Sequence, residues 1–195
     1  MAADDVFLNV PYDRAYEPLF LALVTSLISL GRKPRPVLEI TETGAGRLAR
    51  IFDLLEECPV SIHDLSRTGN PVRFNMPFEL GLASSLRRYA GDHLIIVLES
   101  RKHRLHRTLS DYAGRDPFIH DGRPRALMSC VLDALGPDSD DPTLPEVYSL
   151  WRAVMRVSRE IKKEHGRDVV YHRRLYREVV AATVDLAVVR GLLAP

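Results

Sequence analysis

Residues 59–98, PVSIHDLSRTGNPVRFNMPFELGLASSLRRYAGDHLIIVL, contain a strand, a polar loop, a helix and a second strand in succession. The apolar segment 60–65 predicts the first strand, and residues 76–89 predict the helix. The run LIIVL at 94–98 is unbroken and apolar, which is typical of a strand buried on both faces of a sheet. This order favours two parallel strands joined by a crossover helix.

The same alternation continues along the chain on both sides of this stretch. It predicts strands at 6–10, 36–40 and 118–119 and helices at 16–30 and 124–135, with another helix in which Leu48, Ile51, Phe52 and Leu55 share one face. Short connections and right-handed crossovers then favour a flavodoxin-like α/β fold, a doubly wound five-stranded parallel sheet with strand order 2-1-3-4-5.

The end of the chain predicts a separate helical extension. Residues 136–145, GPDSDDPTLP, are typical of a polar linker that ends the preceding helix. Two amphipathic helices are predicted beyond it, at 146–165 and 169–193. We therefore expect an α/β domain over 1–136 and a C-terminal helical extension over 146–195, which serves assembly or contact with a partner.

The bulk composition narrows the class of protein. Of 195 residues, 46% are hydrophobic and 27% are charged, as in a globular chain, and the net charge of +1 lacks the basic excess typical of nucleic-acid binding. No apolar run reaches the length of a membrane span, and the acidic start of the chain is unlike a signal peptide. Cys58 and Cys130 lie in apolar surroundings, which indicates buried reduced thiols and no metal site. We expect a cytoplasmic protein.

Polar side chains gather where the predicted strands end. In a sheet of this order, ligands bind outside the carboxyl ends of the strands, at the switch point between the first and third strands. Asn9, Asp13, the loop 41–46, Asp64 and Glu79 all fall at that edge. Their convergence from separate segments indicates a site there.

Glu79 is the candidate catalytic residue. It stands in what the pattern predicts as the first turn of a helix, where the helix dipole and free amides favour the ionised carboxylate. Such a carboxylate can stabilise the positive charge that builds on a sugar when an N-glycosidic bond breaks, or attack the anomeric carbon. The alternative is an acid that only stabilises the helix end.

Further side chains at this edge are candidates for binding. Asp64 can hydrogen-bond sugar hydroxyls or handle the leaving base, or can simply form an Asx-turn. Asn75 is placed as the N-cap of the helix at 76–89 and can also meet a ligand. Asn9 and Tyr12, in the turn that opens the first helix, can hold ribose or phosphate.

The remaining candidates are basic or glycine-rich. Gly44, Gly46 and Arg47 form a flexible loop with a cation, which suits an anion. The basic run 101–107 after the LIIVL strand is typical of a solvated loop and is an alternative place to hold phosphates. His63 alternates with Asp64 along its strand, which predicts a packed or exposed ring without a catalytic role.

Residues 64–83, DLSRTGNPVRFNMPFELGLA, resemble the Asp-Leu-(Thr/Ser)…Asn-(x)3-Glu-Leu-Gly-(x)-Ala signature of TIR-like and nucleoside 2-deoxyribosyltransferase-like nucleotide-binding proteins of bacteria. The opening segment FLNVPYDRAYEPLFLAL is similar to the first strand, Pro-Tyr-Asp turn and helix of that group. The resemblance implies that Glu79 is catalytic, that Asp64 assists, and that Asn9, Tyr12 and Asn75 line the pocket.

The resemblance implies an enzyme whose substrate is NAD or a related nucleotide, with no further cofactor. The first hypothesis is a TIR-like glycohydrolase that acts in bacterial antiviral defence. The second is a nucleoside 2-deoxyribosyltransferase or nucleoside hydrolase; Arg73 and Asn75 stand where transferases carry a further acid, which favours hydrolysis over base exchange. The third is a nucleotide-sensing or scaffold module without turnover. In each case we expect a homo-oligomer formed through the C-terminal helices.

Overall fold

The structure, a computed structural model, describes residues 4–39, 46–67, 74–112, 116–136 and 141–194. The chain divides into two compact units, and each is described by itself. One comprises Met1–Pro11 and Pro34–Gly122, and the other comprises Tyr12–Lys33 and Arg123–Pro195. The first helix of the chain is therefore grouped with the C-terminal helices, whereas the sequence suggested a division near the linker 136–145.

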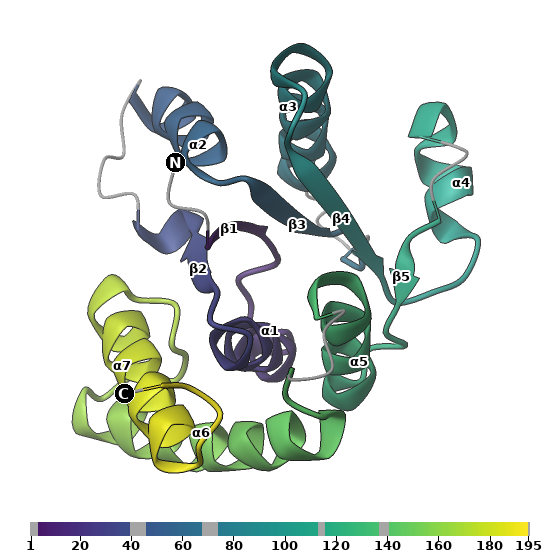
Figure 1. Cartoon of the computed structure of the whole chain (residues 1–195). Coiled ribbons are helices and arrows are strands. Elements are labelled where there is room, and N and C mark those ends of the chain that lie inside the picture. Colours follow the sequence, from purple (N-terminus) through teal and green to yellow (C-terminus); the bar gives the residue numbers. More distant parts are fainter. Residues whose placement is uncertain (1–3, 40–45, 68–73, 113–115, 137–140, 195) are drawn as a thin grey trace. The chain divides into compact units, whose positions relative to one another are not determined.

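Five strands form one parallel sheet in the order β2-β1-β3-β4-β5, which confirms the predicted flavodoxin-like α/β fold (Figure 1). Asn9 pairs with His63 and Asp64 pairs with Leu98, so the carboxyl ends of β1, β3 and β4 lie at one edge. The strands are β1 (Asp5–Asn9), β2 (Lys33–Pro36), β3 (Val60–Asp64), β4 (Leu94–Glu99) and β5 (Phe118–Ile119).

Helices α2 (Gly46–Glu57) and α3 (Asn75–Ala90) lie side by side on one face of this sheet (Figure 1). Met76 and Leu80 of α3 are buried with Val97 of β4, together with Leu105 of the short helix α4 (Arg104–Thr108). Because the side chains of a strand alternate between faces, the residues paired with Val97 point to the same side. His63 and Asn9 therefore share the face that α3 covers.

The predicted strand at 36–40 is wrong in position. The strand is Lys33–Pro36, and the next three residues form a short 3-10 helix, η1 (Val37–Glu39). Arg35 explains this placement, since its guanidinium donates to Glu39 at 2.7 Å, to Glu57 at 3.0 Å and to Asp5 of β1. These contacts hold the start of η1 against β1, and Pro36 has no N–H to extend the ladder.

The second unit is helical and consists of α1 (Glu17–Ser29), α5 (Pro124–Leu135), α6 (Leu144–Glu164) and α7 (Arg173–Val189). Every residue of α1 except Pro18 is buried, as its nearly continuous apolar sequence predicts. Helix α6 begins with a capping box in which Thr143 and Glu146 bind each other's backbone. The two predicted C-terminal helices are thus confirmed.

A chain of polar contacts crosses the face of the sheet under α2 and α3. Asn9 Nδ2 lies 2.9 Å from His63 Nδ1, His63 Nε2 lies 2.9 Å from Ser61 Oγ, and this oxygen lies 2.7 Å from His93 Nε2. Since the amide donates into His63 Nδ1, the proton of that ring is assigned to Nε2, and the hydroxyl of Ser61 donates to His93. Each of these hydrogen bonds can form with both histidine rings neutral.

Burial keeps both histidines of this chain neutral. Burial, with a smaller contribution from His93, lowers the pKa of His63 from its ordinary value of 6.5 to about 3. Burial also lowers the pKa of His93. Of the two predicted alternatives for His63, packed or exposed, the structure has the packed one, since its ring is fully enclosed.

We expect the protein to lose stability as pH falls below about 6.5 because of His63. Below pH 6.5, His63 of the unfolded chain binds a proton, whereas the buried ring of the folded protein stays neutral until about pH 3. The free energy of unfolding that His63 contributes at neutral pH is therefore lost between pH 6.5 and pH 3. The loss from this residue is on the order of 2 kcal/mol at pH 5. Urea unfolding at pH 7 and pH 5 measures it, and His63→Gln should reduce the difference, whereas His172→Gln, at an exposed histidine, should leave it unchanged. An equal pH difference in all three proteins would contradict the assignment.

Candidate functional site

Asn9 joins the carboxyl end of β1 to the beginning of α3. Its side chain is fully buried, and its Nδ2 donates to the carbonyl oxygen of Met76 at 2.8 Å as well as to His63. Both amide protons are then used, so Oδ1 is the atom left to accept. Among the described residues, this buried oxygen has no hydrogen-bond partner. Asn9 therefore fixes the first turn of α3 and presents an acceptor at the strand end.

Glu79 lies in α3, three residues after Met76, and only 6% of it is exposed. The helix begins at Asn75, so Glu79 occupies its second turn, and the prediction of a first-turn position is wrong. Only the first four N–H groups of a helix are free, so Glu79 lies beyond them and receives less stabilisation from the helix end.

Asn75 is also placed differently from the prediction. The N-cap of α3 is Phe74, which has helical dihedral angles and makes no side-chain capping bond, and Asn75 is the first helical residue. The predicted cap is therefore wrong, because Phe74 already continues the helical backbone. The side chain of Asn75 is exposed, which leaves its amide accessible to solvent.

Asp64 ends β3 and forms a buried pair with His120, just after β5. Asp64 Oδ1 accepts from the backbone N–H of Ser66 at 2.8 Å, and Oδ2 lies 3.2 Å from His120 Nε2. The N–H of Gly122 donates to His120 Nδ1 at 3.1 Å, so the ring proton is assigned to Nε2, which lies within ion-pair distance of the carboxylate without the geometry of a hydrogen bond. Neither Asp64 nor His120 has exposed surface. The predicted Asx-turn is present, and the pair holds the loop after β3.

The backbone after β5 is strained to make this pair. Asp121 has φ 53°, an uncommon value for a residue with a side chain, and Gly122 follows with φ 69°. This left-handed turn brings the N–H of Gly122 back to the ring of His120. Sequence reasoning missed His120, although the Asp-Gly dipeptide after a short strand is a turn signal that marks the position.

Arg104 secures the same loop from the end of β4. Its Nε donates to Glu99 Oε2 at 2.8 Å, and its Nη2 donates to the carbonyl oxygen of Ser66 at 2.7 Å. Glu99 is buried, so the pairing of its carboxylate with the Arg104 guanidinium is shielded from solvent. Within the basic run 101–107, Arg104 thus has a structural position, while Arg101, Lys102 and Arg107 are exposed.

Tyr12 and Asp13 belong to the helical unit, where the C-terminal segment contacts them. The hydroxyl of Tyr171 donates to the carbonyl oxygen of Asp13 at 3.1 Å, and its ring lies 5.4 Å from the ring of Tyr12 in an edge-to-face arrangement. Asp13 Oδ1 in turn accepts from the backbone N–H of Tyr16 at 3.1 Å, and this turn leads directly into α1. The C-terminal segment therefore takes part in shaping the predicted binding turn.

A buried carboxylate at the start of α1 secures this arrangement. Glu17 Oε2 accepts from the backbone N–H of Val170 at 2.8 Å, and Oε1 pairs with Lys162 of α6. Glu17 is buried, and a buried charge is stable only with partners of this kind. The sequence reading overlooked Glu17, whose position between Tyr16 and Pro18 resembles an ordinary first-turn acid.

The glycine-rich loop is only partly within the described residues. Gly46 opens α2, and Arg47 follows it in the same helix, with its side chain outside the described part of the structure. Gly44 lies outside the described residues. The predicted contact of these residues with an anion stays a prediction.

The two cysteines are excluded as nucleophiles. Neither is in a disulfide and both are buried, as predicted, and burial raises the pKa of the Cys58 thiol to about 12, so Cys58 stays protonated at neutral pH. Among the described residues, no group of His, Cys, Asp and Glu is arranged to hold a metal ion. Nor does any described helix combine the length and apolar character of a membrane span.

The chain matches no family model, no curated protein and no solved structure. The strand order and the placement of the residues described above therefore carry the functional argument.

We expect His120→Ala to destabilise the protein by about 2–4 kcal/mol, because it leaves the buried carboxylate of Asp64 with one partner fewer. His120→Gln, which can still donate toward the carboxylate, should recover part of that loss. Chemical denaturation of both variants measures the effect. The control is His172→Ala, at an exposed histidine, which should behave like the unmodified protein. If His120→Ala proved as stable as the control, the Asp64–His120 pair would not hold the loop.

Proposed function

We propose that this protein is a glycohydrolase that cleaves the N-glycosidic bond of NAD or a related nucleotide, with Glu79 as the catalytic carboxylate. The observation that supports the proposal most is the link between Asn9 and Met76, three residues before Glu79. It joins a buried strand-end amide to the helix that carries a buried glutamate. Both lie at the edge where sheets of this strand order bind their ligands.

The two side chains are suited to different parts of the substrate. Asn9 Oδ1 is a buried acceptor, and the hydroxyls of a ribose are donors, so this oxygen suits a sugar hydroxyl. The Glu79 carboxylate suits the anomeric carbon, where positive charge builds as the base departs. The exposed Asn75 amide lies one turn before Glu79 and suits a polar group nearer to solvent.

The reaction then needs no group beyond water. The leaving base takes the electron pair of the N-glycosidic bond, and Glu79 either stabilises the cationic sugar or bonds to it. Water adds its oxygen to the anomeric carbon, and the proton that it loses is released. The predicted role of Asp64 with the leaving base stays a prediction; its partners Ser66 and His120 support a second task, which is to hold the first residues after β3.

The test is release of nicotinamide from NAD by the full chain, measured over a wide range of protein concentration. We expect Glu79→Gln to reduce the rate on the order of 10³-fold, because the amide keeps the shape of the side chain but lacks its charge. The matched control is Glu160→Gln, at an exposed glutamate of α6, which should keep full activity. Equal rates for Glu79→Gln and the unmodified protein would sink the proposal.

The same assay separates the alternative functions. Transfer of deoxyribose from a nucleoside to a second base, without hydrolysis of NAD, would identify a deoxyribosyltransferase. A rise in melting temperature with NAD and no product would identify a nucleotide-sensing module. Either result would replace the glycohydrolase.

The proposed role in defence has its own readout in cells. A glycohydrolase that acts on NAD should lower the NAD content of the cells that express it and slow their growth, and Glu79→Gln should do neither. An unchanged NAD content at high expression of active protein would argue against NAD as the substrate and would favour another nucleotide.

A further inference from the structure

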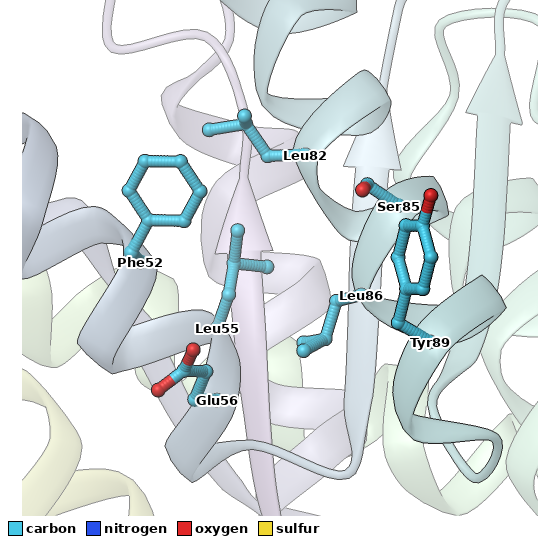
Figure 2. Close-up of a pocket in the computed structure, with 7 residues that line it drawn as sticks. All are labelled: Phe52, Leu55, Glu56, Leu82, Ser85, Leu86 and Tyr89. Atoms are coloured by element: carbon cyan, nitrogen blue, oxygen red, sulfur yellow. The ribbon is translucent and has the colours of Figure 1, made fainter.

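The two units differ in how the charges on their outer helices are paired. On α2, which with α3 borders a mostly apolar groove of about 340 Å³ (Figure 2), Asp53 pairs with Arg50 and Glu57 pairs with Arg35. Helix α6 of the helical unit instead carries exposed cations that have no carboxylate partner in the described part of the chain. These cations are therefore available to an anion from solution.

The exposed cations of α6 form one straight row. They are Arg152, Arg156, Arg159 and Lys163, and all four side chains are exposed. They recur at steps of four, three and four residues, and such steps return each side chain to the same side of a helix. At about 1.5 Å of rise per residue, the row is about 16 Å long.

The cations of this row repel one another. Neighbours with the same charge at a spacing of three or four residues destabilise a helix, and every neighbouring pair in the row has that spacing. Two exposed acids, Glu160 and Glu164, lie to one side of the row, and neither forms an ion pair with it among the residues that the structure describes. An anion bound along the row would remove the repulsion, which the acids of α6 leave in place.

Two more arginines lie near the beginning of the row. The guanidinium of Arg125 lies over the ring of Tyr148, with 5.6 Å from Cζ to the ring centroid, and Nη1 of Arg190 donates to Ser149 Oγ at 3.1 Å. Tyr148 and Ser149 precede Arg152 by about one helical turn. Both contacts are with uncharged groups, so both guanidinium charges add to the positive charge of this surface.

The opposite side of α6 is already buried. Val147, Leu150, Val154 and Ile161 have little or no exposed surface, and α6 packs against α1, α5 and α7 (Figure 1). A basic helix that lies in a membrane surface inserts its apolar side between the lipids. The apolar side of α6 is used inside the protein, so the row favours a partner that binds by charge alone.

The width of the row favours a linear partner. A broad anionic surface would meet Glu160 and Glu164 as well as the cations, whereas a chain of phosphates can follow the cations alone. The row itself contains no aromatic ring, and the nearby rings of Tyr148 and Trp151 stack on each other at 5.3 Å. Single-stranded nucleic acids bind by stacking their bases on open rings, so this surface favours a duplex.

We propose that α6 binds the phosphate backbone of double-stranded DNA. Duplex DNA carries one charge per about 1.7 Å of its axis, so a row of about 16 Å meets several phosphates. Double-stranded RNA is recognised in part through 2′-hydroxyls, which both accept and donate, whereas the row contains only donors. The net charge of +1 conceals the row because acids elsewhere in the chain balance it.

The proposed binding is independent of base sequence and of the proposed chemistry. Contacts with phosphates position a protein on DNA without reading its bases. None of the side chains that form the row is Glu79, Asn9 or Asp64, so loss of DNA binding and loss of NAD cleavage are separate results. A variant of the row should therefore keep the rate of nicotinamide release.

Fluorescence anisotropy of the full chain with a short labelled DNA duplex tests the proposal. Between about 50 and 200 mM salt, the logarithm of the affinity should fall against the logarithm of the salt concentration with a slope between about −3 and −5. Arg156→Gln should make the slope shallower by about 1, equally on duplexes of unrelated sequence. Combined Arg156→Glu and Arg159→Glu should reduce the affinity by about tenfold or more, because two contacts become repulsive.

The matched control reverses two exposed arginines of α3, Arg87→Glu and Arg88→Glu, which changes the net charge by the same amount. This control should keep the affinity within about twofold, and circular dichroism should show that each variant is folded. Equal affinities for the α6 variant and the control would overturn the proposal, as would no binding by the unmodified protein at low salt. Tighter binding to an RNA duplex, to single-stranded DNA or to phosphatidylserine vesicles would replace duplex DNA as the partner.

Discussion

The structure of the site depends on how the protein satisfies one buried amide. The end of a parallel strand that a helix covers on one face cannot turn its polar groups to water, so the side chain of Asn9 must find its partners inside. It uses both protons, one on Met76 of α3 and one on His63 of β3. The contact with Met76 joins the first turn of α3, three residues before Glu79, to the end of β1.

The loop after β3 is held by a second set of contacts, at the ends of three neighbouring strands. Asp64 binds Ser66 and His120, and Arg104 binds Ser66 and Glu99. Each of these side chains is wholly or largely enclosed, so each contact is stronger than it would be in water, and each would be costly to break. Together they hold the first residues after β3 in place with buried electrostatic contacts.

Much of this arrangement follows from patterns in the sequence, and the exceptions have physical causes. The LIIVL run and the alternation around it predict the strand order, because periodicity and right-handed crossovers leave few alternatives. Local patterns do not reveal which atoms a buried side chain will meet. His120 and Glu17 were therefore missed, since their partners Asp64 and Val170 are distant in sequence. The predicted boundaries of elements also differ from the observed ones by a residue or more. Phe74 continues the helical backbone before α3, and the ion pairs of Arg35 hold β2 at an earlier position than predicted.

Helix α3 carries buried side chains on one side and exposed aromatic side chains on the other. Its inner side carries Met76 and Glu79, which are buried, and its outer side carries Phe78 and Tyr89, which are exposed. Phe78 and Glu79 are neighbours in the chain, so about 100° of helix rotation separates the exposed ring from the buried carboxylate. The contact between Asn9 and Met76 holds the helix from its inner side. The position of Glu79 therefore depends on the inner side of α3, where Asn9 binds the helix three residues earlier.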